Sequence, residues 1–154
     1  MGVGAIDTDG SAMTFVNAGV LRAKRTAPQA ERLHQLYTLL IEYIAEIAPD
    51  EIAIEEPFVG RNVKSALSVG RAQAVAMIAA AASDIPVQTY APREVKLAVT
   101  GFGNSSKSQV QEMVLLALQA SAQPMYQDAS DALAVSFCHI NARRAQALTQ
   151  GARA

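Results

Sequence analysis

Two groups of acidic residues have the types and spacing that could bind a metal ion. Glu55 and Glu56 end the run Ile52-Ala53-Ile54, which has the composition of a short strand buried on both faces. Pro57 has no backbone N–H to donate, so we expect the strand to end there. Asp128 and Asp131 open a long predicted helix and, three residues apart, project from one face of it.

Carboxylates brought together in this way suit a hard cation such as Mg²⁺. Two such ions about 4 Å apart can stabilise the attacking and leaving oxygens of phosphodiester hydrolysis. Each residue also has an ordinary role. Successive strand residues face opposite ways, so only one of Glu55 and Glu56 can face a shared site. A helix-opening Asp128 is most often an N-cap, but one cap needs only one side chain and leaves Asp131 unexplained.

Basic and aromatic side chains surround these positions. Lys96 and Lys107 flank a glycine loop, Gly101-Phe102-Gly103-Asn104, which we expect to be flexible. The two lysines could hold phosphates or stabilise a developing negative charge, or they could be ordinary surface lysines. Phe58, just past the strand, could wedge into a base stack or could cap the sheet. His139 lies eight residues after Asp131, ~12 Å along a helix axis, so we interpret it as structural.

Charge is unevenly distributed along the chain. The formal net charge is −1, which by itself does not suggest a nucleic-acid binder. Residues 57–110 nevertheless hold six basic and two acidic groups, whereas residues 1–56 hold four basic and nine acidic groups. Such an asymmetry can build a positive face on a nearly neutral protein, or it can be ordinary surface scatter.

Length and composition predict one globular domain over residues 1–154. The chain has 154 residues, 51% of them hydrophobic, which is enough for a single core. No apolar run reaches the length of a membrane span, and we find no secretion signal. We therefore expect no membrane partner. The single Cys138 cannot form an internal disulfide, and we expect a cytoplasmic protein.

The order of predicted elements favours an α/β layer fold with antiparallel strands first and parallel ones later. Thr8-Asp9-Gly10 marks the turn of a hairpin, and Ser106 with Gln109 has the spacing of a capping box. The expected strands cover residues 2–6, 13–22, 52–57 and 86–90. The expected helices cover residues 29–48, 62–82, 93–99, 107–120 and 128–147, with a polar tail from about 148.

Taken together, these stretches resemble the RuvC family of Holliday-junction resolvases (crossover junction endodeoxyribonucleases). The likeness runs in order from Gly2 to about His139, and as a set the motifs are specific. The matching runs are Ala53-Ile54-Glu55, Phe58, Ser65-Ala66-Leu67-Ser68-Val69-Gly70-Arg71-Ala72, Tyr90-Ala91-Pro92-Arg93-Glu94-Val95-Lys96, Gly101-Phe102-Gly103, Lys107-Ser108-Gln109-Val110-Gln111-Glu112-Met113-Val114 and Asp128-Ala129-Ser130-Asp131-Ala132-Leu133-Ala134.

The resemblance implies an RNase H-like fold, a mixed sheet flanked by helices, and a homodimer. It implies symmetric nicking of four-way DNA junctions in homologous recombination and repair, with one or two Mg²⁺ or Mn²⁺ ions per subunit. A branch-migration complex of the RuvA/RuvB type is implied as partner. Glu55, Asp128 and Asp131 would be the metal ligands and, with Lys107, the catalytic residues. The expected DNA contacts are Phe58, Arg61, Lys64, Arg71, Arg93, Lys96 and Lys107.

The family's fourth acidic residue has no counterpart in this alignment. It lies on a first strand reading roughly Gly-Ile-Asp-Pro-Gly, whereas Gly2-Val3-Gly4-Ala5-Ile6 matches the family's second strand. Asp7 looks superficially similar, but the ungapped match of residues 2–19 puts it at the hairpin turn. We therefore expect a missing central strand, through a start placed too late, which we favour, or through a true truncation. Loss of that strand would leave backbone groups unpaired.

Three alternatives to a junction-cutting enzyme follow from the same residues. The first is a catalytically impaired protein that binds junctions or other DNA with the same fold, because the first metal-binding aspartate is absent. The second is an RNase H-like domain acting on another nucleic acid, such as an RNA–DNA hybrid or a transposon end. The third, an α/β domain with no nucleic-acid role, fits the motif set least well.

Overall fold

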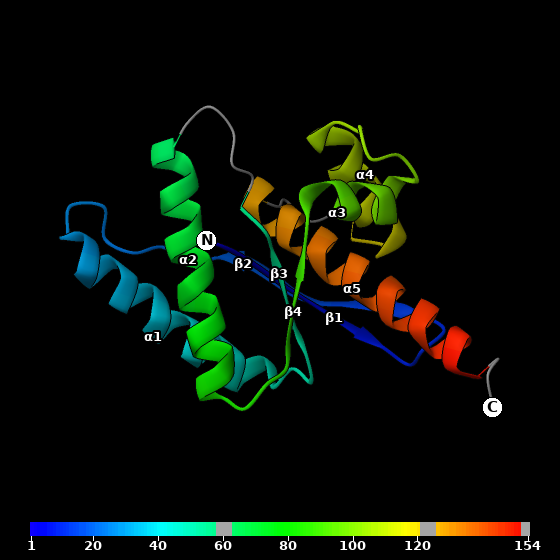
Figure 1. Cartoon of the computed structure of the whole chain (residues 1–154), viewed down its shortest axis with the longest axis horizontal. Coiled ribbons are helices and arrows are strands. Elements are labelled where there is room, and N and C mark those ends of the chain that lie inside the picture. Colours follow the sequence, from blue (N-terminus) through cyan, green and yellow to red (C-terminus); the bar gives the residue numbers. More distant parts are fainter. Residues whose placement is uncertain (58–62, 121–125, 152–154) are drawn as a thin grey trace. The chain divides into compact units, whose positions relative to one another are not determined.

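The computed structural model describes residues 1–57, 63–120 and 126–151 (Figure 1). The chain divides into two compact units. The first unit comprises Met1 and Val20–Pro92, and the second comprises Gly2–Gly19 and Arg93–Ala154. In the described part of the chain, no helix is long and apolar enough to cross a membrane.

Each element expected from the sequence is present in the described residues, in the expected order and with small shifts at its ends. The strands are β1 (Gly2–Thr8), β2 (Met13–Val20), β3 (Ile52–Glu55) and β4 (Val87–Tyr90). The helices are α1 (Gln29–Ile47), α2 (Val63–Ala82), α3 (Pro92–Thr100), α4 (Lys107–Ala117) and α5 (Gln127–Gly151).

The described strands pair as two two-stranded sheets, β1 with β2 and β3 with β4. β1 and β2 form the expected hairpin, whose turn is held by Asp9: its carboxylate accepts hydrogen bonds from the backbone N–H groups of Ser11 and Ala12, both at 2.8 Å. β3 and β4 are parallel, as the sequence indicated, with Ile52 opposite Val87 and Glu55 opposite Tyr90. The parallel pair therefore brings the carboxyl end of β3 beside the end of β4.

The first unit packs two helices, α1 and α2, against each other and α2 against the β3–β4 sheet (Figure 1). Its core includes Leu40 and Ile44 of α1 and Ala79 and Ala80 of α2, all buried. The two alanines have no exposed surface, so the Ala-rich segment of α2 allows the close packing expected from its small side chains.

The second unit is organised around α5, which packs on β1 and on α4 (Figure 1). Leu133 of α5 and Val114 of α4 are fully buried at its centre. α5 continues to Gly151, beyond the end predicted near Ala147, so residues 148–151 of the expected polar tail are helical. The helix meets no Gly or Pro before Gly151, and the Thr149 hydroxyl donates to the Ala145 carbonyl oxygen at 2.7 Å.

α4 ends at Ala117, earlier than the sequence indicated. Gln119 takes a positive φ of 54°, and the Ala120 N–H donates back to the Leu115 carbonyl oxygen at 2.8 Å. This is the geometry in which glycine usually ends a helix, and here a glutamine adopts it. A non-glycine residue in this conformation carries little signal in the sequence, which is why the helix was expected to be longer.

Candidate active site

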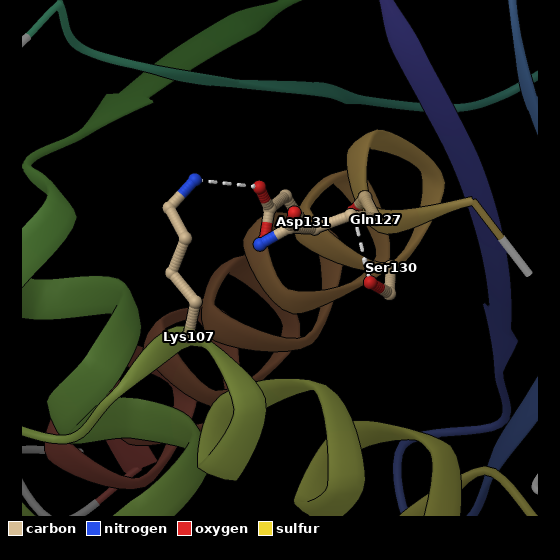
Figure 2. Close-up of polar contacts among 4 residues, drawn as sticks. All are labelled: Lys107, Gln127, Ser130 and Asp131. Carbon is tan, nitrogen blue, oxygen red and sulfur yellow. Dashed lines mark hydrogen bonds and ion pairs between the residues drawn. The ribbon is translucent and has the colours of Figure 1, made fainter.

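The start of α5 presents two aspartates on its outer side, Asp128 in the first turn and Asp131 three residues later. Ala129, Ser130 and Leu133 are buried, so the core holds one face of the helix. Asp128 is exposed and the Asp131 side chain is 29% exposed. The Ser130 hydroxyl donates to the Gln127 carbonyl oxygen at 2.9 Å (Figure 2). This pattern follows from the helical period, because positions 128 and 131 share a face that 129, 130 and 133 leave free.

Asp128 lies within the first turn of α5 and not at its N-cap. The helix begins at Gln127, and the N–H groups of Ala129 and Ser130 donate to the Tyr126 carbonyl oxygen at 3.0 and 3.1 Å. The N-cap explanation offered by the sequence therefore does not account for Asp128. A carboxylate inside the first turn still interacts favourably with the positive end of the helix dipole.

Lys107 reaches Asp131 across 24 residues of sequence. Its Nζ lies 3.1 Å from Asp131 Oδ2, which is both a hydrogen bond and an ion pair (Figure 2). Lys107 is the first residue of α4, directly after the capping box formed by Ser106 and Gln109. The Gln109 N–H donates to Ser106 Oγ at 3.2 Å, and the Ser106 N–H donates to Gln109 Oε1 at 2.9 Å. The predicted capping box is thus confirmed, and it determines where the helix carrying Lys107 begins.

The glycine loop between α3 and α4 is braced by hydrogen bonds. The Thr100 hydroxyl oxygen lies 2.8 Å from the Lys96 carbonyl oxygen, 2.7 Å from the Ser105 hydroxyl and 3.2 Å from the Phe102 N–H. Gly101 has a positive φ of 79°, which glycine adopts without strain. These bonds pair the loop's polar groups locally, which a composition rich in glycine did not indicate.

Gly103 leaves room for the side chain of Arg93, because it has no Cβ. A Cβ at Gly103 would lie 2.9 Å from Arg93 Cγ and 3.0 Å from its Nε, closer than ordinary contacts allow. The exposed Arg93 of α3 therefore lies across the loop that leads to Lys107. Lys96, one turn further along α3, is half-buried. Sequence reasoning proposed both as DNA contacts but did not foresee that a glycine shapes the position of Arg93.

The remaining predicted residues lie in the first unit or outside the described residues. Glu55 is exposed at the end of β3, and the neighbouring Glu56 accepts a hydrogen bond from Thr89 Oγ1 of β4 at 3.0 Å. Arg71 of α2 lies beside Gln29 of α1: with the Gln29 amide turned to present its oxygen, Arg71 Nε donates to it at 2.9 Å. Phe58, Arg61 and the Lys64 side chain fall outside the described part.

Two other residues noted in the sequence have structural surroundings. His139 is buried within α5, in agreement with a structural role. Cys138 is also buried, and burial, with a smaller contribution from Glu94, raises the pKa of its thiol to about 11. Since the thiol is the weak nucleophile and the thiolate the strong one, Cys138 is unsuited to covalent chemistry at neutral pH.

The chemistry of the aspartate pair fits a hard cation, and the pair alone is an incomplete ligand set. Two carboxylates on one helical turn offer the oxygen ligands that Mg²⁺ prefers. Within either unit, the described residues contain no cluster of three or more His, Cys, Asp or Glu side chains that could hold a metal ion. Glu55 belongs to the first unit and the aspartates to the second, and their sharing of one site stays a prediction.

Sequence reasoning missed two residues that lie against α5, one at residues 127–131 (called the acidic turn below) and one just beyond them. Gly2 and Gly4 of β1 face α5, where Gly2 is next to Asp128 and Gly4 next to Leu133. A Gly-x-Gly pattern inside a strand was the available signal, because glycine in a strand often marks the close approach of another backbone.

Comparison with known proteins identifies relatives along nearly the whole chain. The family model described as crossover junction endodeoxyribonuclease RuvC matches residues 1–139. A protein of that name from Dehalococcoides mccartyi is 46% identical over 143 residues, which cover 93% of this chain and 86% of the relative. Another from Chloroflexus aggregans is 46% identical over 139 residues, 90% of this chain and 85% of the relative.

Solved structures agree with the sequence comparison. The RuvC of T. thermophilus in complex with a Holliday junction substrate is similar with a TM-score of 0.86 and 28% identity, over 94% of this chain and 88% of that one. A further Thermus thermophilus RuvC structure has a TM-score of 0.79 and 30% identity, over 92% and 87% of the two chains. The fold is therefore RNase H-like, and the chain belongs to the RuvC family of crossover junction endodeoxyribonucleases.

Proposed function

We propose that this chain is a structure-specific endonuclease that resolves Holliday junctions by metal-dependent symmetric nicking, within homologous recombination and DNA repair. The observation that carries the proposal is the family match over residues 1–139, because this range contains every residue assigned to the site. The relatives' name and the junction-bound T. thermophilus structure support the same substrate.

The metal would be held by Glu55, Asp128 and Asp131. RuvC enzymes are metal-dependent nucleases, and the all-carboxylate donor set favours Mg²⁺, with Mn²⁺ as the alternative, at one or two ions per subunit. When bound, such ions supply an activated water and neutralise charge on the scissile phosphate. Asp131 also pairs with Lys107, whose Nζ lies 3.1 Å from Asp131 Oδ2.

The protein's own cations would position the DNA. Lys107 places a positive charge beside Asp131, where it would neutralise negative charge that develops on the phosphate. Arg71, Arg93 and Lys96 would bind backbone phosphates. Phe58, Arg61 and Lys64 complete the proposed DNA surface as predictions from the sequence. Symmetric nicking needs two equivalent sites, which a homodimer would supply.

The proposed setting is the cytoplasm, where a branch-migration complex of the RuvA/RuvB type would present the junction. The partner complex is inferred from membership of the RuvC family. The setting is inferred from the single Cys138, which cannot form an internal disulfide.

The test is cleavage of a synthetic four-way junction with each strand labelled in turn, with and without Mg²⁺. We expect paired nicks at symmetric positions in opposite strands. Asp128→Asn should abolish nicking and retain junction binding, because the amide keeps the shape of the side chain but loses its charge. Asp84→Asn, an exposed aspartate outside the site, is the matched control and should cut normally.

Each other outcome contradicts a different part of the proposal. Junction binding without cutting by the unaltered chain would favour the catalytically impaired DNA-binding protein. Equal cleavage of linear duplex would remove the junction specificity, and preferred cleavage of an RNA–DNA hybrid would indicate another nucleic acid as substrate. Full activity of Asp128→Asn would exclude Asp128 as a metal ligand.

A further inference from the structure

The first half of β1 turns two glycines toward α5. Gly2 and Gly4 are two residues apart, so they lie on the same face of the strand. A Cβ built at Gly2 would overlap the carbonyl oxygen and carbon of Asp128. A Cβ at Gly4 would lie 3.0 Å from Leu133 Cγ, Cδ2 and backbone N. The backbone of α5 thus approaches β1 as closely as glycine permits.

Further contacts hold α5 along the strand. The Ser136 hydroxyl donates to the Gly4 carbonyl oxygen at 3.1 Å. Arg144 Nη2 donates to Thr8 Oγ1 and to the Ala12 carbonyl oxygen, both at 3.1 Å. From Asp128 to Arg144 the helix rises about 24 Å, and from Gly2 to Thr8 the strand spans about 20 Å. The helix therefore contacts the strand near the start, the middle and the end of β1.

We propose that Gly2 and Gly4 are positioning residues for the acidic turn of α5. Because neither residue has a Cβ, the helix can pack closely on β1, and this close packing determines the position of the Asp128 and Asp131 carboxylates. The importance of that placement rests on the proposed function, in which both carboxylates bind metal. The geometric part stands on the contacts alone.

The atoms nearest to a new Cβ determine which part of α5 must move when either glycine is replaced by alanine. At Gly2 they are mainly Asp128 backbone atoms, which cannot rotate away as the end of a long side chain could. The first turn of α5 must therefore move if Gly2 becomes alanine. At Gly4 the Leu133 side chain can yield in part, but the Leu133 backbone nitrogen cannot. Gly4→Ala should consequently act in the same direction as Gly2→Ala and more weakly.

Gly19 provides a matched control on the same hairpin. A Cβ at Gly19 would meet only Val3 Cγ2, at 4.0 Å, which is ordinary van der Waals contact. Gly19→Ala therefore changes the same residue type in the neighbouring strand, with the same loss of backbone freedom. It should leave the packing of α5 on β1 unchanged.

The experiment uses the full chain labelled with ¹⁵N and measures amide shifts in the metal-free protein and then the affinity for Mn²⁺. In Gly2→Ala and Gly4→Ala we expect displaced amide signals for residues 127–131, while signals from α1 in the first unit stay in place. We expect Mn²⁺ binding to weaken about tenfold in Gly2→Ala, the lower end of what altered support of a metal ligand costs. Gly19→Ala should match the unaltered protein in both measurements.

A folded Gly2→Ala protein with unchanged signals for residues 127–131 and unchanged Mn²⁺ affinity would overturn the proposal. A lower melting temperature with neither change would also overturn it, because that result describes a purely structural role. If Gly2→Ala does not fold, Gly4→Ala decides by the same two criteria. If the unaltered chain binds no Mn²⁺, the proposed metal site fails, and the amide signals still decide whether the glycines position the turn.

Discussion

Lys107 and Asp131 form a surface ion pair whose value lies in position more than in stability. The Lys107 side chain is 66% exposed and that of Asp131 29% exposed. Exposed pairs of this kind contribute about 0–1 kcal/mol, because water screens the charges and both side chains lose freedom. A substitution at Lys107 can therefore separate a role in cleavage from a role in folding.

We expect Lys107→Gln to lower the single-turnover rate of junction cleavage on the order of a hundredfold, as the loss of a group that stabilises developing charge does in other enzymes. The free energy of unfolding in urea should change by less than ~1 kcal/mol. Lys24→Gln, at an exposed lysine of the first unit, is the control and should cut at the normal rate. Unchanged cleavage by Lys107→Gln would leave this lysine without the proposed role.

At the scale of elements, the start of α4 could be predicted from the sequence and its end could not. The capping box of Ser106 and Gln109 follows from spacing alone and is present with both hydrogen bonds. The end of α4 depends on Gln119 in a left-handed conformation. Propensity does not favour that conformation for glutamine, so it has to be stabilised by the surrounding structure. The hydrogen bonds of the loop after α3 were likewise not predicted, because Gly101 and Gly103 indicated a flexible loop.

Loss of the capping box should destabilise the unit that carries Lys107. Ser106→Ala removes the acceptor for the Gln109 N–H, and we expect the free energy of unfolding to fall by about 1 kcal/mol. Urea denaturation followed by circular dichroism measures this change. Ser68→Ala, at an exposed position inside α2, is the control and should lose no stability, since alanine is the better helix former. Equal stability of Ser106→Ala and the unaltered protein would show that the cap contributes nothing.

For the whole molecule, the sequence identified the candidate residues, but it did not predict which of them are in contact. Helical spacing placed Asp128 and Asp131 on one face, which the structure shows. The meeting of Lys107 with Asp131 could not be derived, because it depends on how α4 packs on α5. The roles of these residues came from the family resemblance, since spacing alone suits many surface helices. That Glu55 joins the aspartates stays a prediction.

Overall charge would have hidden a DNA-binding role, because six basic groups of residues 57–110 are balanced elsewhere in a chain of net charge −1. If the basic segment binds the junction, affinity should fall steeply with salt as phosphate counterions are released. Fluorescence anisotropy with a labelled junction, at several salt concentrations, gives the slope of log Kd against log salt.

A substitution at Arg93 tests whether the salt dependence of junction binding comes from this part of the surface. Arg93→Gln should weaken junction binding and reduce the slope by about one, the effect of losing one phosphate contact. Arg32→Gln, an exposed arginine of α1 in the acidic part of the sequence, lowers the net charge equally and should leave the slope unchanged. Equal effects of the two substitutions would mean that net charge alone, and not the position of Arg93 across Gly103, governs binding.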